Sequence, residues 1–487
     1  MDRGLNHDEH QFLAPGALLA NDGLLPFRDY PIFHLPNLTF IYAALDRLTG
    51  RPILSAKLFS VCCSWVTGVL LVGTSYRFPP FGKPRYAFPA AALALGFLFF
   101  DPLFVYTSGK TWNHEFPTCL TIAATLLVAK NLGAASIRLS LLAGVLIGCA
   151  AGARLTFAPI LIPLGLAHFA AETTTRRKIL LGLGFGGGAF AGLLPSILLY
   201  LAAPEAFLFD NFQFPRLRLL DPTNDRIQKT MVWWRKLRYL GKEIAIPSWP
   251  LFTAFILLGI HPGIQAIRRR NKEGAAGALV LLTIPFVIAG CFAPSRYQQQ
   301  HYFVLIPFLI LSALLGVAAA PDNRMARLNR MVIPVLLIFS FGAYCMSQSH
   351  KSGTGFAWIP QIFQPDEWFP NSAHAKSAEL RSLVGPGKVL TLAPTWATEA
   401  GMKIYPEFAN GPFAWRAAHL LDEEKRKRLG IIAPANLEEF LAQDAPAAVL
   451  VGIEDERLEA PLREYALRHG YRKVKMSRKW ELWVRPA

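Results

Sequence analysis

The sequence predicts a polytopic α-helical membrane protein with a C-terminal extracytoplasmic α/β domain. Mean hydropathy is +0.31, and only 17% of the 487 residues are charged, whereas a soluble protein carries about 25%. The apolar residues are grouped into runs that approach the roughly 20 residues needed to cross a bilayer. After residue 347 the composition changes, and short apolar strands alternate with helical segments.

The N-terminal segment, residues 1–51, is polar and carries the adjacent carboxylates Asp8 and Glu9 between two histidines. At a membrane surface one carboxylate can take a proton from an acceptor, while its neighbour holds a metal or a sugar hydroxyl. The alternative is a solvated acidic turn ahead of a helix. Residues 35–48 have apolar side chains at helical spacing, which predicts an interfacial helix that ends at Gly50.

About ten membrane spans are expected between residues 52 and 347. The pair 139–153 and 156–172 is interrupted by Arg154 and Pro159, so it fits either a bent hairpin or a re-entrant pair. The expected spans are 52–76, 86–107, 114–129, 139–153, 156–172, 179–201, 249–267, 274–293, 302–320 and 331–347.

Basic residues predict the orientation. Alternate short loops are rich in Lys and Arg, as in 176–178 and 268–270, which places these loops in the cytoplasm. Residues 1–51, the loop 202–248 and the domain 348–487 then lie outside a cell membrane. The net charge of +17 is thereby explained by topology, without nucleic acid as a partner. Because the N-terminus lies outside with no span before it, we expect a further first span upstream of Met1.

Besides residues 1–51, two further outer loops carry polar residues that are candidates for a site. Lys110, His114 and Glu115 share one short loop, where a carboxylate again follows a histidine. Arg216 and Arg218 belong to a loop in which basic and aromatic residues alternate, a composition that suits lipid headgroups and phosphate or an ordinary interfacial belt.

A fourth outer turn combines Arg296 with Tyr297 and His301. An Arg fork matches phosphate oxygens, so this turn fits phosphate recognition; the alternative is an interfacial anchor.

Two further patterns have structural explanations. The glycine-rich stretch 182–192 lies inside an expected span, which favours close helix packing over a nucleotide-binding loop. The six cysteines fall within or at the ends of spans, with no disulfide framework and no zinc-type spacing. In the C-terminal domain, strands are expected at 388–392, 447–451 and 480–484, and helices near 373–383, 436–442 and 457–469.

Together, several of these strings resemble the C-type membrane glycosyltransferases. The matching features are the acidic pair Asp8-Glu9, the string Gly23 to Asp29, and His34-x-Pro36 before an interfacial helix. The outer turn from Arg296 to Tyr302, ahead of a span with Pro307, is similar as well. Within that superfamily the nearest groups are the protein O-mannosyltransferases and the aminoarabinose transferases.

The resemblance implies inverting transfer of a sugar from a polyprenyl-phosphate donor, at the outer face of the membrane, to a glycan, lipid or protein acceptor. Asp8 would be the general base, and Glu9 would support it or help hold a divalent metal. Metal ligation by Glu9, His10 or His114 is left open, and no other cofactor is expected. His114 and Glu115 form a secondary polar site. The residues expected to bind substrate and phosphate are Arg296, His34, Lys110, Arg216, Arg218, Tyr297 and His301.

A non-catalytic carrier or flippase for lipid-linked glycans is the alternative. Such a protein needs polar residues along its spans at mid-bilayer depth. The spans carry few such charges, with Arg154 and Lys57 as the main candidates, and the polarity gathers at one face instead. This distribution favours the enzyme.

Overall fold

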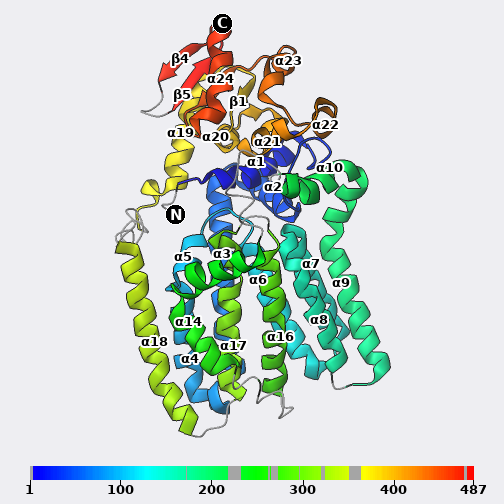
Figure 1. The fold of residues 1–487 in the computed structure, drawn as a ribbon, viewed down its shortest axis with the longest axis vertical. Coiled ribbons are helices and arrows are strands. Elements are labelled where there is room, and N and C mark those ends of the chain that lie inside the picture. The colour runs from blue at the N-terminus through cyan, green and yellow to red at the C-terminus, as the bar shows by residue number, and fades with distance from the viewer. Residues whose placement is uncertain are drawn as a thin grey trace.

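The computed structural model describes residues 4–171, 173–217, 232–260, 264, 272–294, 297–319, 324–349, 363–475 and 480–486. A bundle of long helices forms one end of the molecule, and a small α/β domain forms the other (Figure 1). Between them lie α1 (His7–Asp22) and α2 (Asn37–Thr49), which run across the end of the bundle beneath the domain (Figure 1). The expected interfacial helix is α2, and Gly50 ends it in a left-handed conformation.

Five helices in the described residues are long and apolar enough to span a membrane, which makes this a multi-pass membrane protein. A sixth span is added if residues 233–245 and 249–260, bent by 102°, are counted as one. The figure of ten spans therefore stays a prediction. The five ranges are Pro52–Arg77, Glu115–Ala134, Thr175–Ala202, Gly274–Phe292 and Gln299–Ala319.

Most helix boundaries follow the expected segments, with one clear correction. The run 86–107 is not one span, because Asp101 accepts hydrogen bonds from the backbone of residues 103 and 104 and caps a new helix that begins with Pro102. The helices of the bundle are α3 (Pro52–Arg77), α4 (Ala87–Phe99), α5 (Pro102–Thr107), α6 (Glu115–Ala134), α7 (Ile137–Ala153), α8 (Leu161–Ala167), α9 (Thr175–Ala202), α14 (Trp249–Ala254), α16 (Lys272–Phe292), α17 (Leu305–Ala319) and α18 (Arg324–Ser349).

The loop expected at 202–248 also contains helices. Short helical segments replace an extended connection on both sides of the undescribed residues 218–231. They are α10 (Pro204–Leu208), η5 (Phe209–Gln213), α11 (Phe214–Leu217), α13 (Trp233–Tyr239) and η6 (Leu240–Ala245).

Glycines bring α7 and α9 into backbone contact, which confirms the packing expected for residues 182–192. A Cβ at Gly144 would clash with the carbonyl oxygen of residue 185, and one at Gly188 with that of residue 141. At the end of this helix pair, the side-chain amide of Asn37 donates to the carbonyl oxygens of Cys149 (3.3 Å) and Gly192 (2.9 Å). Asn37 therefore fixes α2 to the bundle.

The C-terminal domain contains a five-stranded sheet in the order β2-β1-β3-β5-β4. β1 (Lys388–Leu390) is parallel to β2 (Lys403–Ile404) and β3 (Ala448–Val451), whereas β5 (Glu481–Val484) is antiparallel to β3 and β4 (Arg472–Lys475). The three expected strands are β1, β3 and β5. The helices are α19 (Phe369–Leu383), α20 (Pro394–Glu399), α21 (Pro412–Ala417), α22 (Glu423–Leu429), α23 (Leu437–Leu441) and α24 (Glu456–Arg468).

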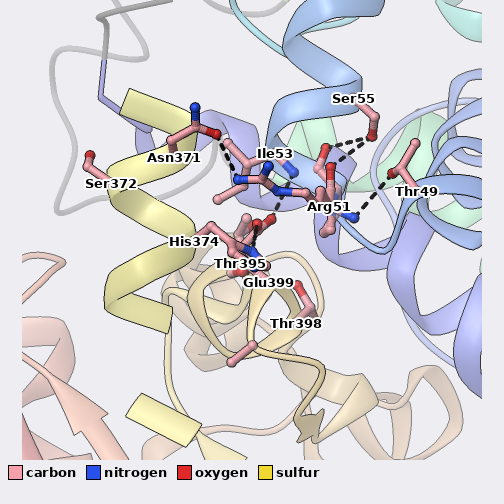
Figure 2. Close-up of polar contacts among 12 residues, drawn as sticks. Thr49, Arg51, Ile53, Ser55, Asn371, Ser372, His374, Thr395, Thr398 and Glu399 are labelled. Carbon is pink, nitrogen blue, oxygen red and sulfur yellow. Dashed lines mark hydrogen bonds and ion pairs between the residues drawn. The ribbon is translucent and has the colours of Figure 1, made fainter. Parts of the chain in front are cut away.

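A polar junction joins this domain to the start of α3 (Figure 2). The fully buried carboxylate of Glu399 accepts hydrogen bonds from the backbone N–H of Ile53 (2.9 Å) and from Nδ1 of His374 (2.8 Å). Arg51 donates from Nη2 to the side-chain oxygen of Asn371 at 2.7 Å. Two helices of the domain, α19 and α20, are thereby tied to the turn between α2 and α3.

Candidate active site under the first turn of helix α1

Asp8 and Glu9 lie in the first turn of α1. The side chain of Asn6 accepts a hydrogen bond from the backbone N–H of Asp8 (3.0 Å), and the backbone N–H of Asn6 donates to Oε2 of Glu9 (2.6 Å). This capping box starts the helix. The two neighbouring carboxylates have different surroundings: Glu9 is buried beside Lys57, and Asp8 is partly exposed beside His7.

Glu9 is fully buried and tied to the bundle. Its Oε1 accepts hydrogen bonds from the backbone N–H and the hydroxyl of Thr111, both at 2.9 Å, and lies 3.4 Å from Nζ of the buried Lys57. Burial raises the pKa of Glu9, but Lys57 and the hydrogen bonds outweigh it, so the pKa lies below its usual range. These contacts favour the supporting role of Glu9 over metal ligation.

Asp8 is the more accessible of the two carboxylates. Its side chain is 21% exposed, and its Oδ1 lies 3.1 Å from Nε2 of the more exposed His7. The hydrogen bond that His7 donates to Asp8 raises the pKa of His7 against the effect of burial. Asp8 is therefore the carboxylate that an acceptor can reach.

The charges of Arg154 and Asp8 both act on His34. Burial and the charge of Arg154 lower the pKa of His34 to about 3, while the charge of Asp8 opposes them. The ring stacks on Phe12 with centroids 4.8 Å apart. His34 is consequently neutral at physiological pH and serves as a hydrogen-bonding group.

A hydrogen-bond chain fixes the tautomer of His34. Arg154 can only donate, and its Nη1 donates to the side-chain oxygen of Asn113 at 2.6 Å. The amide nitrogen of Asn113 then faces Nδ1 of His34 at 3.4 Å, so Nδ1 accepts. Nε2 of His34 therefore carries the proton and donates to Oε1 of Gln11 at 3.0 Å.

Arg154 is the centre of this polar group, and the sequence did not predict it as a site residue. It follows α7, its Nη1 lies 3.1 Å from Nε2 of His114, and its Nε donates to the hydroxyl of Thr156 at 3.0 Å. We call Asp8, His34, Asn113, His114 and Arg154 the Arg154 cluster. A guanidinium close to a reachable carboxylate can hold a phosphate while the carboxylate accepts a proton.

His301 and Lys110, which the sequence predicts to bind phosphate, also lie at this end of the bundle. The ring of His301 lies 6.3 Å from that of His114. Nζ of Lys110 sits over the rings of Tyr106 (3.7 Å) and Trp112 (4.0 Å), and the cation is held there by the aromatic faces. The sequence had placed Lys110, His114 and His301 at a common outer surface, and the structure brings them to one end of the bundle.

Of the remaining predicted residues, Tyr297 and Arg216 have other surroundings, and two are undescribed. Tyr297 packs on Tyr239 with centroids 4.5 Å apart, and Arg216 is exposed on α11. Arg218 and Arg296 fall outside the described residues.

Glu115 has a different environment from Asp8. Glu115 is only 1% exposed. A carboxylate this enclosed cannot meet an acceptor that arrives from outside. Of the two candidate carboxylates, the geometry favours Asp8 as the base.

The three candidate metal ligands do not converge. Glu9 binds Thr111 and Lys57, His10 faces the C-terminal domain, and His114 lies against Arg154. Within the described ranges, no group of three or more His, Cys, Asp or Glu residues is arranged to hold a metal ion. A joint site of Glu9, His10 and His114 is therefore not formed.

An apolar cavity of about 200 Å³ lies in the bundle between α4, α14, α17 and α18. Its walls include Phe97, Leu251, Leu258 and Ile310. Such a cavity suits a hydrocarbon chain and offers nothing to a polar ligand.

Comparison with solved structures finds this fold in ArnT from Cupriavidus metallidurans. The crystal structure bound to undecaprenyl phosphate aligns with a TM-score of 0.58 and 12% identity, over 100% of this chain and 95% of that one. The apo structure gives 0.59 and 12%, over 99% and 94%. No protein-family model matches the chain, and no curated protein matches its sequence. The chain thus has the fold of ArnT, a C-type membrane glycosyltransferase, the superfamily that its sequence resembles.

Proposed function

We propose that this protein is a glycosyltransferase that moves a sugar from a polyprenyl-phosphate donor to an acceptor hydroxyl or phosphate. The observation that carries the proposal is the Arg154 cluster, in which the charge of the reachable carboxylate Asp8 acts on Arg154 and on His34, and Arg154 is joined to His34 through Asn113. The fold adds support, because one ArnT structure with this fold holds undecaprenyl phosphate. The apolar cavity suits part of the donor's hydrocarbon tail.

The proposed reaction is a direct displacement. Asp8 takes the proton of the acceptor as the acceptor oxygen bonds to the anomeric carbon of the donor sugar. The bond from that carbon to the phosphate oxygen breaks at the same time, and polyprenyl phosphate leaves with the electron pair. Arg154 stabilises the charge that develops on this phosphate. The predicted contributions of Lys110, Arg216, Arg218, Arg296, Tyr297 and His301 to phosphate binding belong to the same proposal.

The carrier or flippase alternative is not favoured by the positions of the charges. Lys57 contacts Glu9 of α1, and Arg154 contacts Asn113 and His114, so both charges lie at the end of the bundle next to α1. A translocation path requires such groups at mid-bilayer depth. We further propose that this end of the bundle, with the domain 348–487, faces the outside of the cell membrane, and that the unit boundaries are 1–51, 52–347 and 348–487.

The proposal is tested by turnover of a polyprenyl-phosphate sugar in reconstituted membranes. Asp8→Asn keeps the size of the side chain but removes the base, so release of polyprenyl phosphate should fall by about 10²-fold or more. Arg154→Lys keeps the charge but loses the fork, so donor affinity should fall while the protein stays monodisperse. Asp366→Asn, on the surface in η11 (Pro365–Glu367), is the control.

Translocation of the donor without release of polyprenyl phosphate would identify a flippase and refute the proposal. Unchanged turnover in Asp8→Asn would remove Asp8 from the mechanism.

A further inference from the structure

A second cavity, of about 500 Å³, separates the first turn of α1 from the C-terminal domain. Its volume falls within the range of about 300–1,000 Å³ that is typical of small-molecule sites. His7 and His10 line it from α1, one helical turn apart and therefore on the same face of the helix. The opposing wall is formed by Trp396, Arg416, Glu454 and Trp480.

One wall of this cavity is aromatic. The rings of Trp396 and Trp480 pack edge to face with centroids 4.4 Å apart, and the ring of Phe369 lies 6.0 Å from that of Trp396. Trp396 belongs to α20, which the junction of Glu399 with Ile53 fixes against the bundle (Figure 2). Rigid indole rings offer an apolar face with a polar edge, a surface on which the C–H face of a sugar ring packs well.

The lining of the cavity also contains a carboxylate with unused hydrogen-bonding capacity. The side chain of Glu454 is 6% exposed, and its oxygens lie 3.8 Å from Nε2 of His10 and 3.9 Å from Nη2 of Arg416. Both distances exceed hydrogen-bond length. Glu459 accepts hydrogen bonds from the backbone N–H groups of residues 452–454 at 2.6, 3.3 and 3.0 Å, which holds the loop that presents Glu454.

His10 adds a buried group that lacks a partner. Its side chain is 2% exposed, and its Nδ1 has no hydrogen-bond partner within the described residues. Burial lowers the pKa of His10 to about 4, so the ring is neutral and has one donor and one acceptor nitrogen. Leaving such a group unsatisfied is unfavourable. Hydroxyl groups both donate and accept, so a sugar satisfies the ring in either tautomer.

The charge of the lining selects among ligands. Two acidic side chains, Glu454 and Asp455, and one guanidinium, that of Arg416, line the cavity, and burial raises the pKa of Glu454 to about 7. This balance disfavours a phosphate group and accommodates a neutral or an amino sugar.

We propose that this cavity binds a saccharide unit of the acceptor, a neutral or amino sugar ring held between the two tryptophans and Glu454. The inference rests on the proposed function, since an acceptor requires a transferase. His7 lines the cavity, and its Nε2 lies 3.1 Å from Oδ1 of Asp8, so a sugar bound there lies next to the proposed base.

The test uses the full chain in lipid nanodiscs, applied to a printed array of neutral, amino and phosphorylated glycans. We expect neutral or amino glycans to bind. Trp480→Ala and Glu454→Gln should each lower their affinity by about tenfold or more, and Trp480→Phe should restore most of it. Trp65→Ala is the matched control, because Trp65 is 59% exposed on α3.

Binding of undecaprenyl phosphate to the same nanodiscs separates this inference from the proposed function. Wild type and all four variants should bind that lipid equally. If the lipid binds but no glycan does, or only phosphorylated glycans do, the saccharide site is refuted while the transferase proposal stands. Glycan binding that Trp480→Ala and Glu454→Gln leave unchanged also refutes it. Failure of the wild type to bind the lipid counts against the proposed function instead.

Discussion

Glu9 and Glu115 are two buried acidic residues near one end of the bundle, and replacing each with Gln should affect stability differently. Oε1 of Glu9 accepts from Thr111 and faces Lys57, while Oε2 accepts from Asn6. Both oxygens of Glu9 accept hydrogen bonds, but glutamine has only one acceptor oxygen. In Glu9→Gln the side-chain NH2 group must therefore face a hydrogen-bond donor at one of these two positions. Lys57 would also become a buried charge without its counter-ion. Breaking a buried pair in this way costs about 3–5 kcal/mol.

Glu115→Gln lacks these penalties. Within the described residues no Lys or Arg lies at ion-pair distance from Glu115, as Lys57 does from Glu9, so its replacement by glutamine leaves no buried charge without a counter-ion. We expect the unfolding temperature to stay the same or rise.

Thermal unfolding of the detergent-purified protein at one scan rate measures both effects. Glu9→Gln should lower the apparent midpoint by several degrees, and the double variant Glu9→Gln/Lys57→Met should recover most of the loss, because it also removes the unpaired cation. Equal shifts in Glu9→Gln and Glu115→Gln, or no recovery in the double variant, would refute the assigned role of the Glu9–Lys57 contact.

The pH dependence gives an independent check. The pKa of Glu9 is lower in the folded protein than in the unfolded chain. Its stabilising contribution is therefore complete above the pKa of the unfolded chain and is lost as the pH falls through the pKa of the folded state. Glu9→Gln should weaken the acid dependence of the unfolding midpoint. An unchanged acid profile in this variant would assign that dependence to other groups.

Two further predictions concern packing. Gly148→Ala should lower the unfolding midpoint strongly, because the added Cβ would clash with the carbonyl oxygen of Ala189 on α9. Gly186→Ala, on the same helix pair, places its Cβ in open space and should be neutral or stabilising. Equal effects of the two substitutions would contradict the close contact between the helices. Glu399→Ala removes the hydrogen-bond acceptor for Ile53 and His374. Limited proteolysis should therefore release the C-terminal domain sooner than in the wild type. An unchanged cleavage rate would show that other contacts hold the domain.

Local signals predicted much of the fold. Runs of apolar residues indicated a membrane bundle, and the glycines of residues 182–192 indicated a close helix contact. Asn6 and Glu9 also match a capping box, so the helical start of α1 was visible in the sequence, although the acidic pair was not assigned to a helix. β2 has only two residues and β4 is dominated by basic side chains, so neither resembles a buried strand.

The site was harder to predict, because its members come from distant parts of the chain. Arg154 interrupts two apolar runs, which in the sequence indicated a break in a span. Its contacts with Asn113 and His114 join residues about 40 positions apart, and His34 lies 79 positions from Asn113. The spacing of residues along the chain does not reveal that these side chains contact one another. One signal could have suggested this site: a single Arg follows an apolar helix directly, and Asn and His lie in another loop at the same end of the bundle.

The contact between α7 and α9 has a mechanical consequence. Where two helices touch through their backbones, no side chain lies between them to change rotamer, so the pair resists separation. α4, α14, α17 and α18 instead enclose a cavity lined by apolar side chains, so these helices make fewer contacts there and can part at lower cost. A long lipid entering sideways from the bilayer would therefore be expected to enter beside α18, with α7 and α9 acting as the fixed frame against which that side opens.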